Sequence, residues 1–159
     1  MLSENKPHIE IIDYSEEYKN DIKILNYAWL EKYFKVEAGD EKSLSNPKEE
    51  ILDKGGRIFY ARIDGKIVGT ASLLKKPNGD FELGKMAVDD DFQGFGIGKM
   101  LMEHCLAEAK KSGIKKLILY SNTRLGNAIH LYRKYGFVEV PVTDSAYKRS
   151  DIKMELEIL

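Results

Sequence analysis

The segment Gln93-Gly94-Phe95-Gly96-Ile97-Gly98 stands between an apolar stretch, residues 81–88, and a helix-like stretch, residues 99–111. Glycines at alternate positions let the backbone approach a ligand closely, because no Cβ stands in the way. The N–H groups of such a turn and of the first helical residues lack partners within the helix, and the helix dipole adds to their positive potential. This order of strand, turn and helix predicts a site for a phosphorylated ligand near Phe95.

The spacing of the segment separates three known phosphate-binding patterns. A P-loop requires glycine where Gln93 stands and serine or threonine where Met100 stands. The dinucleotide fingerprint G-x-G-x-x-G finds its first two glycines here but meets Lys99 at its third position. The pattern Q/R-x-x-G-x-G/A is matched in full by Gln93, Gly96 and Gly98.

A second motif, A-x-x-x-Y-x-K-x-G-F, runs from Ala128 to Phe137. Its apolar and aromatic residues recur at helical spacing, and Gly136 suits the end of a helix. Together the two motifs resemble the GNAT family of N-acetyltransferases, which bind acetyl-coenzyme A (acetyl-CoA). The resemblance covers residues 57–140 and more weakly the rest of the chain.

Composition places the chain among ordinary globular proteins. It has 159 residues, 43% hydrophobic and 32% charged, with a formal net charge of −1 and Cys105 as its one cysteine. We expect a single domain over residues 1–159, without an intrachain disulfide. No apolar run approaches the roughly 20 residues that span a bilayer, and the polar stretch 1–7 lacks the apolar region of a signal peptide. We therefore expect a cytoplasmic protein that binds neither nucleic acid nor membrane.

The pattern of apolar residues predicts strands and helices in an α/β (α+β) order. Ser15 is expected to cap a helix that runs through Tyr33, and residues 39–47 are expected to form a loop before a short helix at 47–52. Asp64-Gly65 and Asn78-Gly79 are hairpin signals. Strands are expected at residues 8–12, 57–63, 67–74, 81–88, 117–120, 137–140 and 152–158. The sum is the GNAT fold: a mixed, mostly antiparallel sheet with a central parallel βαβ pair and helices on both faces.

The resemblance implies that acetyl-CoA is the co-substrate. It also implies that the thioester carbonyl of acetyl-CoA accepts a hydrogen bond from the backbone N–H of Met86. In the family a bulge on this strand opens the cofactor cleft, and Gly84 marks the place for one. On a regular strand Glu82, Gly84 and Met86 share a face. The residues that the resemblance assigns to the cofactor are Met86, Ala87, Val88, Gln93, Gly94, Phe95, Gly96, Ile97, Gly98 and Lys99.

Glu82 and Tyr132 are the candidate catalytic residues. An amine with a pKa near ~10 is mostly protonated at neutral pH, so its attack needs a base, and the departing thiolate needs an acid. Several family members carry a glutamate at the place of Glu82; the alternatives are a solvated glutamate paired with lysine and a water chain as the base. Tyr132 matches the family's general acid, and its alternative is a core tyrosine on the helix face.

Two asparagines are weaker candidates for the cofactor. Family members often place an asparagine three residues before the motif alanine, where this chain has Leu125. Asn122 or Asn127 can take that role, and each is equally suited to be a cap. The neighbours His104 and Cys105 point in different directions from a helix, and no metal motif occurs, so we expect no metal.

The resemblance places the acceptor amine near Trp29, Tyr33 and Phe34 and near residues 141–149. Glu31, Glu37, Asp40 and Glu41 are candidates to attract a cationic amine, although a helix face and an acidic loop explain these residues as well. We expect transfer of an acetyl group to the primary amine of a small molecule. The alternatives are an enzyme that acetylates proteins or peptides and a non-catalytic acyl-CoA sensor. A homodimer is expected from the resemblance alone.

Overall fold

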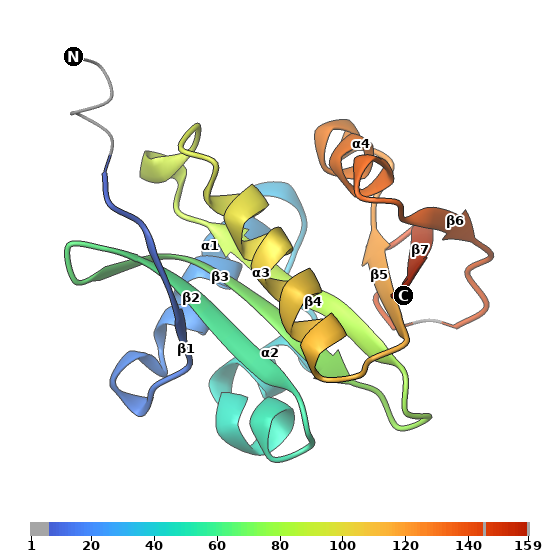
Figure 1. Cartoon of the computed structure of the whole chain (residues 1–159), viewed down its shortest axis with the longest axis horizontal. Coiled ribbons are helices and arrows are strands. Elements are labelled where there is room, and N and C mark those ends of the chain that lie inside the picture. The colour runs from blue at the N-terminus through green and yellow to red at the C-terminus, as the bar shows by residue number, and fades with distance from the viewer. Residues whose placement is uncertain (1–6, 145, 159) are drawn as a thin grey trace.

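The computed structural model describes residues 7–144 and 146–158, and within them seven strands form one sheet. Figure 1 shows the sheet, whose order is β1-β2-β3-β4-β5-β7-β6. Among the described strands, β4 and β5 pair in parallel and the other neighbours pair antiparallel. The predicted mixed sheet with one parallel pair is confirmed. The strands are β1 (Glu10–Asp13), β2 (Arg57–Ile63), β3 (Lys66–Lys75), β4 (Phe81–Val88), β5 (Lys116–Ser121), β6 (Val138–Val140) and β7 (Ile152–Glu157).

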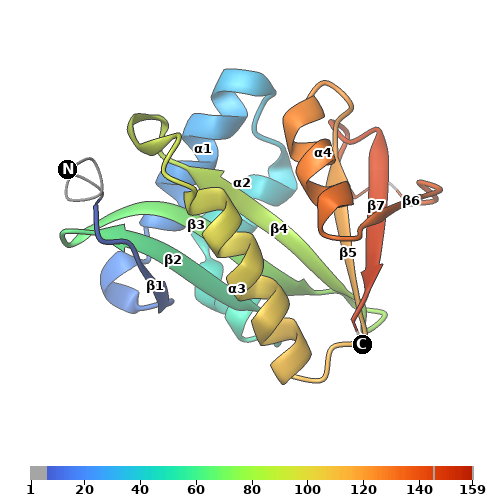
Figure 2. The same ribbon diagram turned by 45° about the horizontal axis from the view of Figure 1, so that its top comes forward.

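Helices cover both faces of the sheet, as predicted (Figure 2). On one face α3 (Ile97–Lys111) and α4 (Gly126–Lys134) pack over a core that includes Leu101 and Phe137. On the other face α1 (Asp21–Tyr33), α2 (Ala38–Ser45) and a π-helical turn, η3 (Lys48–Leu52), enclose a second core around Ile22 and Tyr60. Two short 3-10 turns, η2 (Glu16–Tyr18) and η4 (Asp90–Phe92), complete the described elements.

The turns follow from local chemistry. Asp64 and Gly65 both have positive φ, at 48° and 80°, which closes the predicted hairpin between β2 and β3. At the end of α4, Gly136 has φ of 99°, its N–H bonds to the Arg133 carbonyl, and the N–H of Phe137 bonds to the Tyr132 carbonyl. This is a Schellman motif, so the predicted Gly-Phe stop of the helix is confirmed.

The predicted helix from Ser15 to Tyr33 is wrong in its first turns. The side chain of Ser15 does act as a cap, but of the 3-10 turn η2, and α1 begins separately at Asp21. The hydroxyl of Tyr60 donates to the Tyr18 carbonyl at 2.7 Å. In a continuous helix that carbonyl would accept the N–H of Ile22, so a long-range contact interrupts the local pattern.

The predicted loop over residues 39–47 is also wrong, because residues Ala38–Ser45 form α2. A capping box starts this helix: the Glu37 side chain accepts the N–H of Asp40, and the Asp40 side chain accepts the N–H of Glu37 at 3.0 Å. Leu44 is buried against the second core, which adds the apolar contact that a short helix needs.

Asp40 also ties α2 to the C-terminal part of the chain. Arg149 donates to both oxygens of Asp40, at 2.7 and 3.1 Å, and Lys85 donates to Oδ1 at 3.0 Å. Burial alone would raise the pKa of Asp40, but its bonds to Arg149 and the charge of Lys85 outweigh burial and hold that pKa below its usual value. The carboxylate is therefore ionised and paired in the folded protein.

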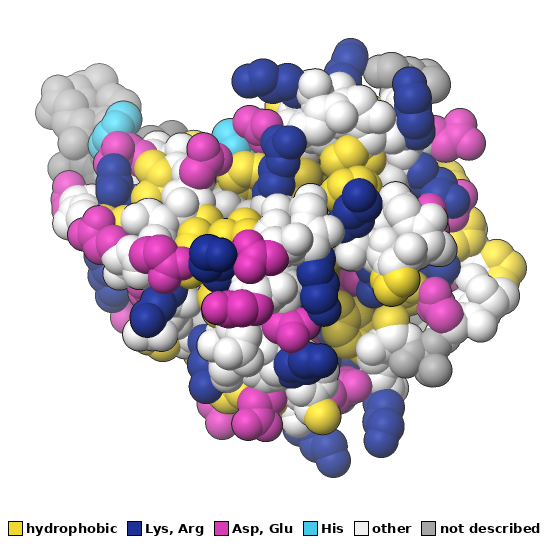
Figure 3. All heavy atoms as spheres, turned by 90° about the horizontal axis from the view of Figure 1, so that it is seen from below, with side chains coloured by type: hydrophobic (Ala, Val, Ile, Leu, Met, Phe, Trp, Pro, Cys, Tyr) yellow, Lys and Arg dark blue, Asp and Glu magenta, His cyan; other side chains and the backbone are white. Residues whose placement is uncertain are grey.

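The surface shows no separation of charge on the face drawn in Figure 3, where basic and acidic side chains are interspersed over most of the area. Across residues 7–144 and 146–158, every helix is too short or too polar to pass through a bilayer. Residues 1–6, which make up most of the stretch considered for a signal peptide, lie outside the described residues. Ser145, within the stretch 141–149 expected near the acceptor amine, lies outside them as well.

We expect Asp40→Asn to destabilise the protein in a pH-dependent way. Breaking one partner of a buried ion pair costs roughly 3–5 kcal/mol at neutral pH. Because the pKa of Asp40 is lowered on folding from a usual 3.8, its ionisation stabilises the fold above that value, and this contribution disappears as the pH falls through the lowered pKa. The difference in unfolding free energy between wild type and Asp40→Asn, measured by urea denaturation, should narrow from pH 7 to pH 3.

Asp53→Asn is the matched control, since Asp53 pairs with Lys48 at 3.1 Å with both side chains more than half exposed. An exposed ion pair contributes little to stability, so this variant should resemble wild type at both pH values. A gap between wild type and Asp40→Asn that stays constant with pH would contradict the assigned pairing.

Candidate active site

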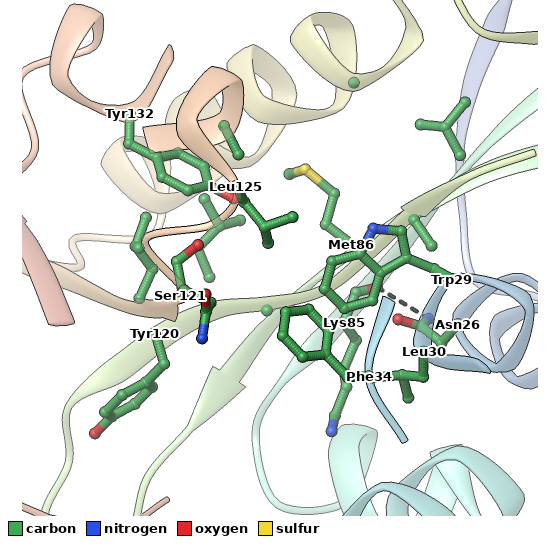
Figure 4. Close-up of a pocket in the computed structure, with 18 of the residues that line it drawn as sticks. Asn26, Trp29, Leu30, Phe34, Lys85, Met86, Tyr120, Ser121, Leu125 and Tyr132 are labelled. Atoms are coloured by element: carbon green, nitrogen blue, oxygen red, sulfur yellow. Dashed lines mark hydrogen bonds between the residues drawn. The ribbon is translucent and has the colours of Figure 1, made fainter. Parts of the chain in front are cut away.

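The site lies where β4 and β5 separate. These strands pair only at Phe81 with Leu117 and at Glu82 with Ile118, and beyond this point the register between them ends. A cavity of about 390 Å³ opens between them, lined by β4, β5, α1, α4 and the glycine-rich loop. Figure 4 shows side chains from α1, β4, β5 and α4 converging on it.

A β-bulge in β4 accompanies this separation. In the pairing with β3, Gly84 lies opposite Ser72 and Ala87 opposite Thr70, so Lys85 and Met86 together face the single residue between them. Lys85 has φ of 51°, a left-handed conformation that non-glycine residues rarely adopt. The bulge expected at Gly84 is therefore present, but its strained residue is Lys85.

The bulge corrects the expected faces of β4. A regular strand would place Met86 on the same face as Glu82, yet Met86 packs against the core beneath α3. Lys85, on the other hand, reaches Asp40 on α2. The additional residue in the bulge inverts the alternation. Gly84 has its own reason: a Cβ there would lie 2.7 Å from Oε2 of Glu82.

The glycine-rich loop closes one end of the cavity. Gly94 and Gly96 have φ of 86° and 76°, and a Cβ at either would meet nothing within 4 Å, so both face open space. Gly96 is the N-cap of α3, whose first turn contains no acidic residue. Amides at this helix start suit an anion such as a pyrophosphate. Of the expected cofactor residues, Met86, Ala87, Val88, Gln93, Gly94, Gly96, Ile97 and Gly98 line the cavity, whereas Phe95 and Lys99 do not.

Glu82 lies at the other end with only 2% of its surface exposed. Its Oε1 accepts a hydrogen bond from Nζ of Lys76 at 3.0 Å, and its Oε2 accepts one from the Tyr147 hydroxyl at 2.9 Å. Burial, together with the charge of Glu82, raises the pKa of Tyr147 well above its usual value, so the phenol stays protonated. One alternative drawn from the sequence was a solvated glutamate paired with a lysine. Glu82 does pair with a lysine, but it is buried rather than solvated.

Tyr132 reaches from α4 into the cavity (Figure 4). Its ring packs edge-on against Phe137, with 6.1 Å between the ring centroids. Burial raises the pKa of the hydroxyl, which keeps its proton at neutral pH. The side chain therefore combines the two interpretations drawn from the sequence: the ring contacts the core and the residue also lines the cavity.

Aromatic side chains from α1 and from its C-cap form part of the cavity wall. Trp29 and Phe34 line the cavity, and their rings lie 5.5 Å apart (Figure 4). Tyr33, the third residue expected here, is 43% exposed and packs on the outside of Trp29. Tyr120 and Tyr147 add two aromatic rings on the side of β5.

The two asparagines occupy different places. Asn122 lines the cavity, but its Nδ2 donates to the Arg149 carbonyl at 2.8 Å and its Oδ1 accepts the N–H of Arg124 at 2.8 Å. These bonds stabilise the turn after β5. They resemble the capping role that was the alternative to cofactor binding for Asn122. Asn127 is exposed in the first turn of α4 and is not among the residues that line the cavity.

The acidic residues expected to attract an amine are mostly engaged elsewhere. Glu37 and Asp40 both pair with Arg149, at 3.0 and 2.7 Å, and Asp40 also pairs with Lys85. Their charges are thus compensated within the protein. Glu31 and Glu41 are exposed. The sequence interpretation missed Lys85 and Arg149, because single basic residues in aperiodic or bulged segments carry no local signal of burial.

Other reactive side chains lie away from the cavity. Burial raises the pKa of Cys105 to about 12, so its thiol is unreactive at neutral pH. His104 packs edge-on against Phe59 with 4.6 Å between ring centroids. Within residues 7–144 and 146–158, His, Cys, Asp and Glu side chains form no group of three suited to a metal ion.

Comparison with known proteins connects this geometry to a family. A model of the Acetyltransferase (GNAT) family matches residues 22–137. The chain is 27% identical over 143 residues to the ribosomal protein bS18-alanine N-acetyltransferase of Escherichia coli K12, with 90% of this chain and 86% of that protein aligned. It is 35% identical over 89 residues to an uncharacterized N-acetyltransferase of Mycobacterium tuberculosis, covering 56% and 57% of the two chains.

Solved structures share the fold. An acetyltransferase of the GNAT family from Staphylococcus aureus superposes with a TM-score of 0.84 at 24% identity, over 96% of this chain and 100% of that one. The PaiA N-acetyltransferase of Thermoplasma acidophilum in complex with coenzyme A gives a TM-score of 0.72 at 24% identity, over 94% and 99%. The family model spans most of the chain, and the chain therefore belongs to the GNAT family of acetyltransferases, which use acetyl-CoA.

Proposed function

We propose that this acetyltransferase transfers an acetyl group from acetyl-CoA directly to the primary amine of a small molecule. The observation that carries the proposal is the continuous cavity between β4 and β5. Backbone amides suited to phosphates line one end, and a buried carboxylate, Glu82, lies at the other with aromatic walls between. Such a cavity suits a phosphorylated donor and a compact acceptor at one reaction centre.

Binding of the donor follows from the strand and the loop. The amides of residues 94–98 and the start of α3 hold the pyrophosphate. Ala87 and Val88 pair with the pantetheine arm as an added strand, because β5 has left this edge of β4. The N–H of Met86 donates to the thioester carbonyl and stabilises the negative charge that develops on its oxygen.

Glu82 and Tyr132 then move the two protons. The neutral amine nitrogen attacks the carbonyl carbon, and Glu82 accepts the proton that the nitrogen loses, directly or through water. The C–S bond breaks, and the thiolate takes a proton from the hydroxyl of Tyr132. The bonds from Lys76 and Tyr147 fix the orientation of the Glu82 carboxylate.

Contacts between the segments that line the cavity favour a small acceptor. Arg149, in the segment before β7, bonds to Glu37 and Asp40 at the start of α2. Across the rim, Arg124 donates to the Tyr33 carbonyl at 3.1 Å and lies over the ring of Phe34. To bind an extended peptide, the protein would have to separate the segments that these contacts hold together.

A second candidate acceptor is the N-terminal amine of a protein. The Escherichia coli relative that aligns with most of this chain is an alanine N-acetyltransferase for ribosomal protein bS18. A primary amine on a short, mobile protein terminus needs the same chemistry at Glu82. The acceptor class is therefore decided by experiment with both kinds of amine.

The first experiment is calorimetric titration with acetyl-CoA, followed by a thiol-release screen on the same sample. Amino acids, polyamines and peptides that begin with alanine serve as acceptors. Release with small amines alone supports the proposal, and release with peptides alone overturns it in favour of the protein acceptor. Tight binding without release by any amine supports a non-catalytic acyl-CoA sensor.

We expect Gly96→Asp to abolish binding of coenzyme A. The carboxylate would project into the open space at the start of α3, where the phosphates bind. Repulsion between the new carboxylate and the phosphates of the cofactor should weaken binding of coenzyme A by at least about 100-fold, measured by calorimetry. Gly96→Asn is the control, because asparagine has the same shape and tolerates positive φ but carries no charge. Equal affinities of the two variants would refute the assignment of the loop.

We expect Tyr132→Phe to lower kcat by about 10²–10⁴-fold, the usual contribution of a general acid. The ring contact with Phe137 is retained, so the affinity for coenzyme A should change little. Tyr135→Phe is the matched control, because it removes a tyrosine hydroxyl at the C-cap of the same helix from a residue that does not line the cavity. Full activity of Tyr132→Phe would assign Tyr132 to the core alone.

A further inference from the structure

The bulge in β4 depends on contacts from outside the sheet. Lys85 has a strained backbone conformation, with φ of 51°, which a glycine at this position would adopt without strain. The side-chain Nδ2 of Asn26, on α1, donates to the Lys85 carbonyl at 3.2 Å, which Figure 4 marks with a dashed line. The ammonium of the same lysine donates to Asp40 at 3.0 Å. Both the backbone and the side chain of Lys85 are thus held.

These holding groups are buried. Asn26 is 4% exposed among the apolar residues of α1, and its Nδ2 also donates to the Ile22 carbonyl at 2.8 Å. The side chains of Lys85 and Asp40 are 7% and 0% exposed. A buried amide and a buried ion pair are costly to place in a core and need geometry that satisfies them. Here the buried amide bonds to the carbonyl of Lys85 and the buried ion pair includes its side chain, so both act on one residue of β4.

The planarity of the peptide bond links this contact to the cavity. The carbonyl of Lys85 and the N–H of Met86 belong to the same peptide unit and, in the trans form, point in opposite directions. A hydrogen bond that draws the carbonyl toward α1 therefore directs the N–H away from α1. Met86 and Lys85 both line the cavity, so this peptide unit forms part of its wall.

We propose that Asn26 is a positioning residue for acetyl transfer: by holding the Lys85 carbonyl, it keeps the N–H of Met86 directed at the thioester carbonyl, with Asp40 as a second anchor through the lysine side chain. The inference rests on the proposed function, because it assigns the N–H of Met86 to the carbonyl of acetyl-CoA. Asn26 itself acts through the backbone and forms no bond with the reacting atoms.

The test is Asn26→Leu, which keeps the approximate size of the side chain and removes its donor. The direct readout is the infrared band of the ¹³C-labelled thioester carbonyl in the complex with acetyl-CoA alone. In wild type a hydrogen bond should shift this band to lower frequency than in free acetyl-CoA, and in Asn26→Leu the band should return toward the free value. With an active amine, kcat should fall by about 10- to 100-fold, as expected for a misplaced oxyanion donor, while the affinity for coenzyme A stays within about threefold.

Thr70→Val is the matched control. It removes one buried bond from a side chain to the backbone, from Oγ1 of Thr70 to the Phe59 carbonyl at 3.1 Å, and leaves the bulge contacts in place. Both variants should lose similar stability, but only Asn26→Leu should change the band. If Asn26→Leu does not fold, Asn26→Ser replaces it, since a serine can still bond to the Ile22 carbonyl but is too short to reach Lys85.

The outcomes separate this inference from the proposed function. An unchanged band and kcat in Asn26→Leu would overturn the positioning role, and so would a wild-type band identical to that of free acetyl-CoA. A shifted wild-type band that the variant loses supports the role of Asn26. The same result without turnover of any small amine would reject only the proposed acceptor, because the band is measured in the absence of an amine.

Discussion

The separation of β4 from β5 after two paired residues is the constraint on which the site depends. Two adjacent parallel strands that stayed paired would fill the space between them with backbone hydrogen bonds and leave no room for a ligand. The pairing ends at Glu82, the bulge at Lys85 follows in the same strand, and β4 is left with an unpaired edge within the sheet. Unpaired edges are ordinarily a liability, and here the edge lines the cavity.

The sequence elements that follow the two strands explain why the cavity has two chemically different sides. The chain leaves β4 through the glycine-rich loop into α3, and leaves β5 through a turn into α4. Amides for an anion therefore stand beside one strand, and Tyr132 stands beside the other. The buried Glu82 lies close to the point where the strands part and lines the cavity from within the sheet.

Compensated charges hold the segments around this cavity together. Asp40 accepts bonds from Lys85 in β4 and from Arg149 near the C-terminus, and it is also the N3 residue of the capping box that starts α2. One carboxylate thus connects a helix, the strained strand and the segment before β7. Removing the Asp40 carboxylate would leave the buried ammonium of Lys85 without its ion-pair partner, which is why such networks behave as units.

The features that depend on neighbouring residues could be predicted from the sequence: the glycine-rich loop, the two hairpins, strands β2 and β4, and the α4 helix with Tyr132 and its Gly-Phe end. These features follow from backbone preferences and periodicity, which act over a few residues. The tertiary structure alone decided that Ala38–Ser45 is a helix, that Lys85 rather than Gly84 is strained, and that Asn26 and Arg149 contact the site. The reason is physical: these contacts join residues far apart in the chain, and whether a polar side chain is buried and paired depends on groups that only the fold brings to it.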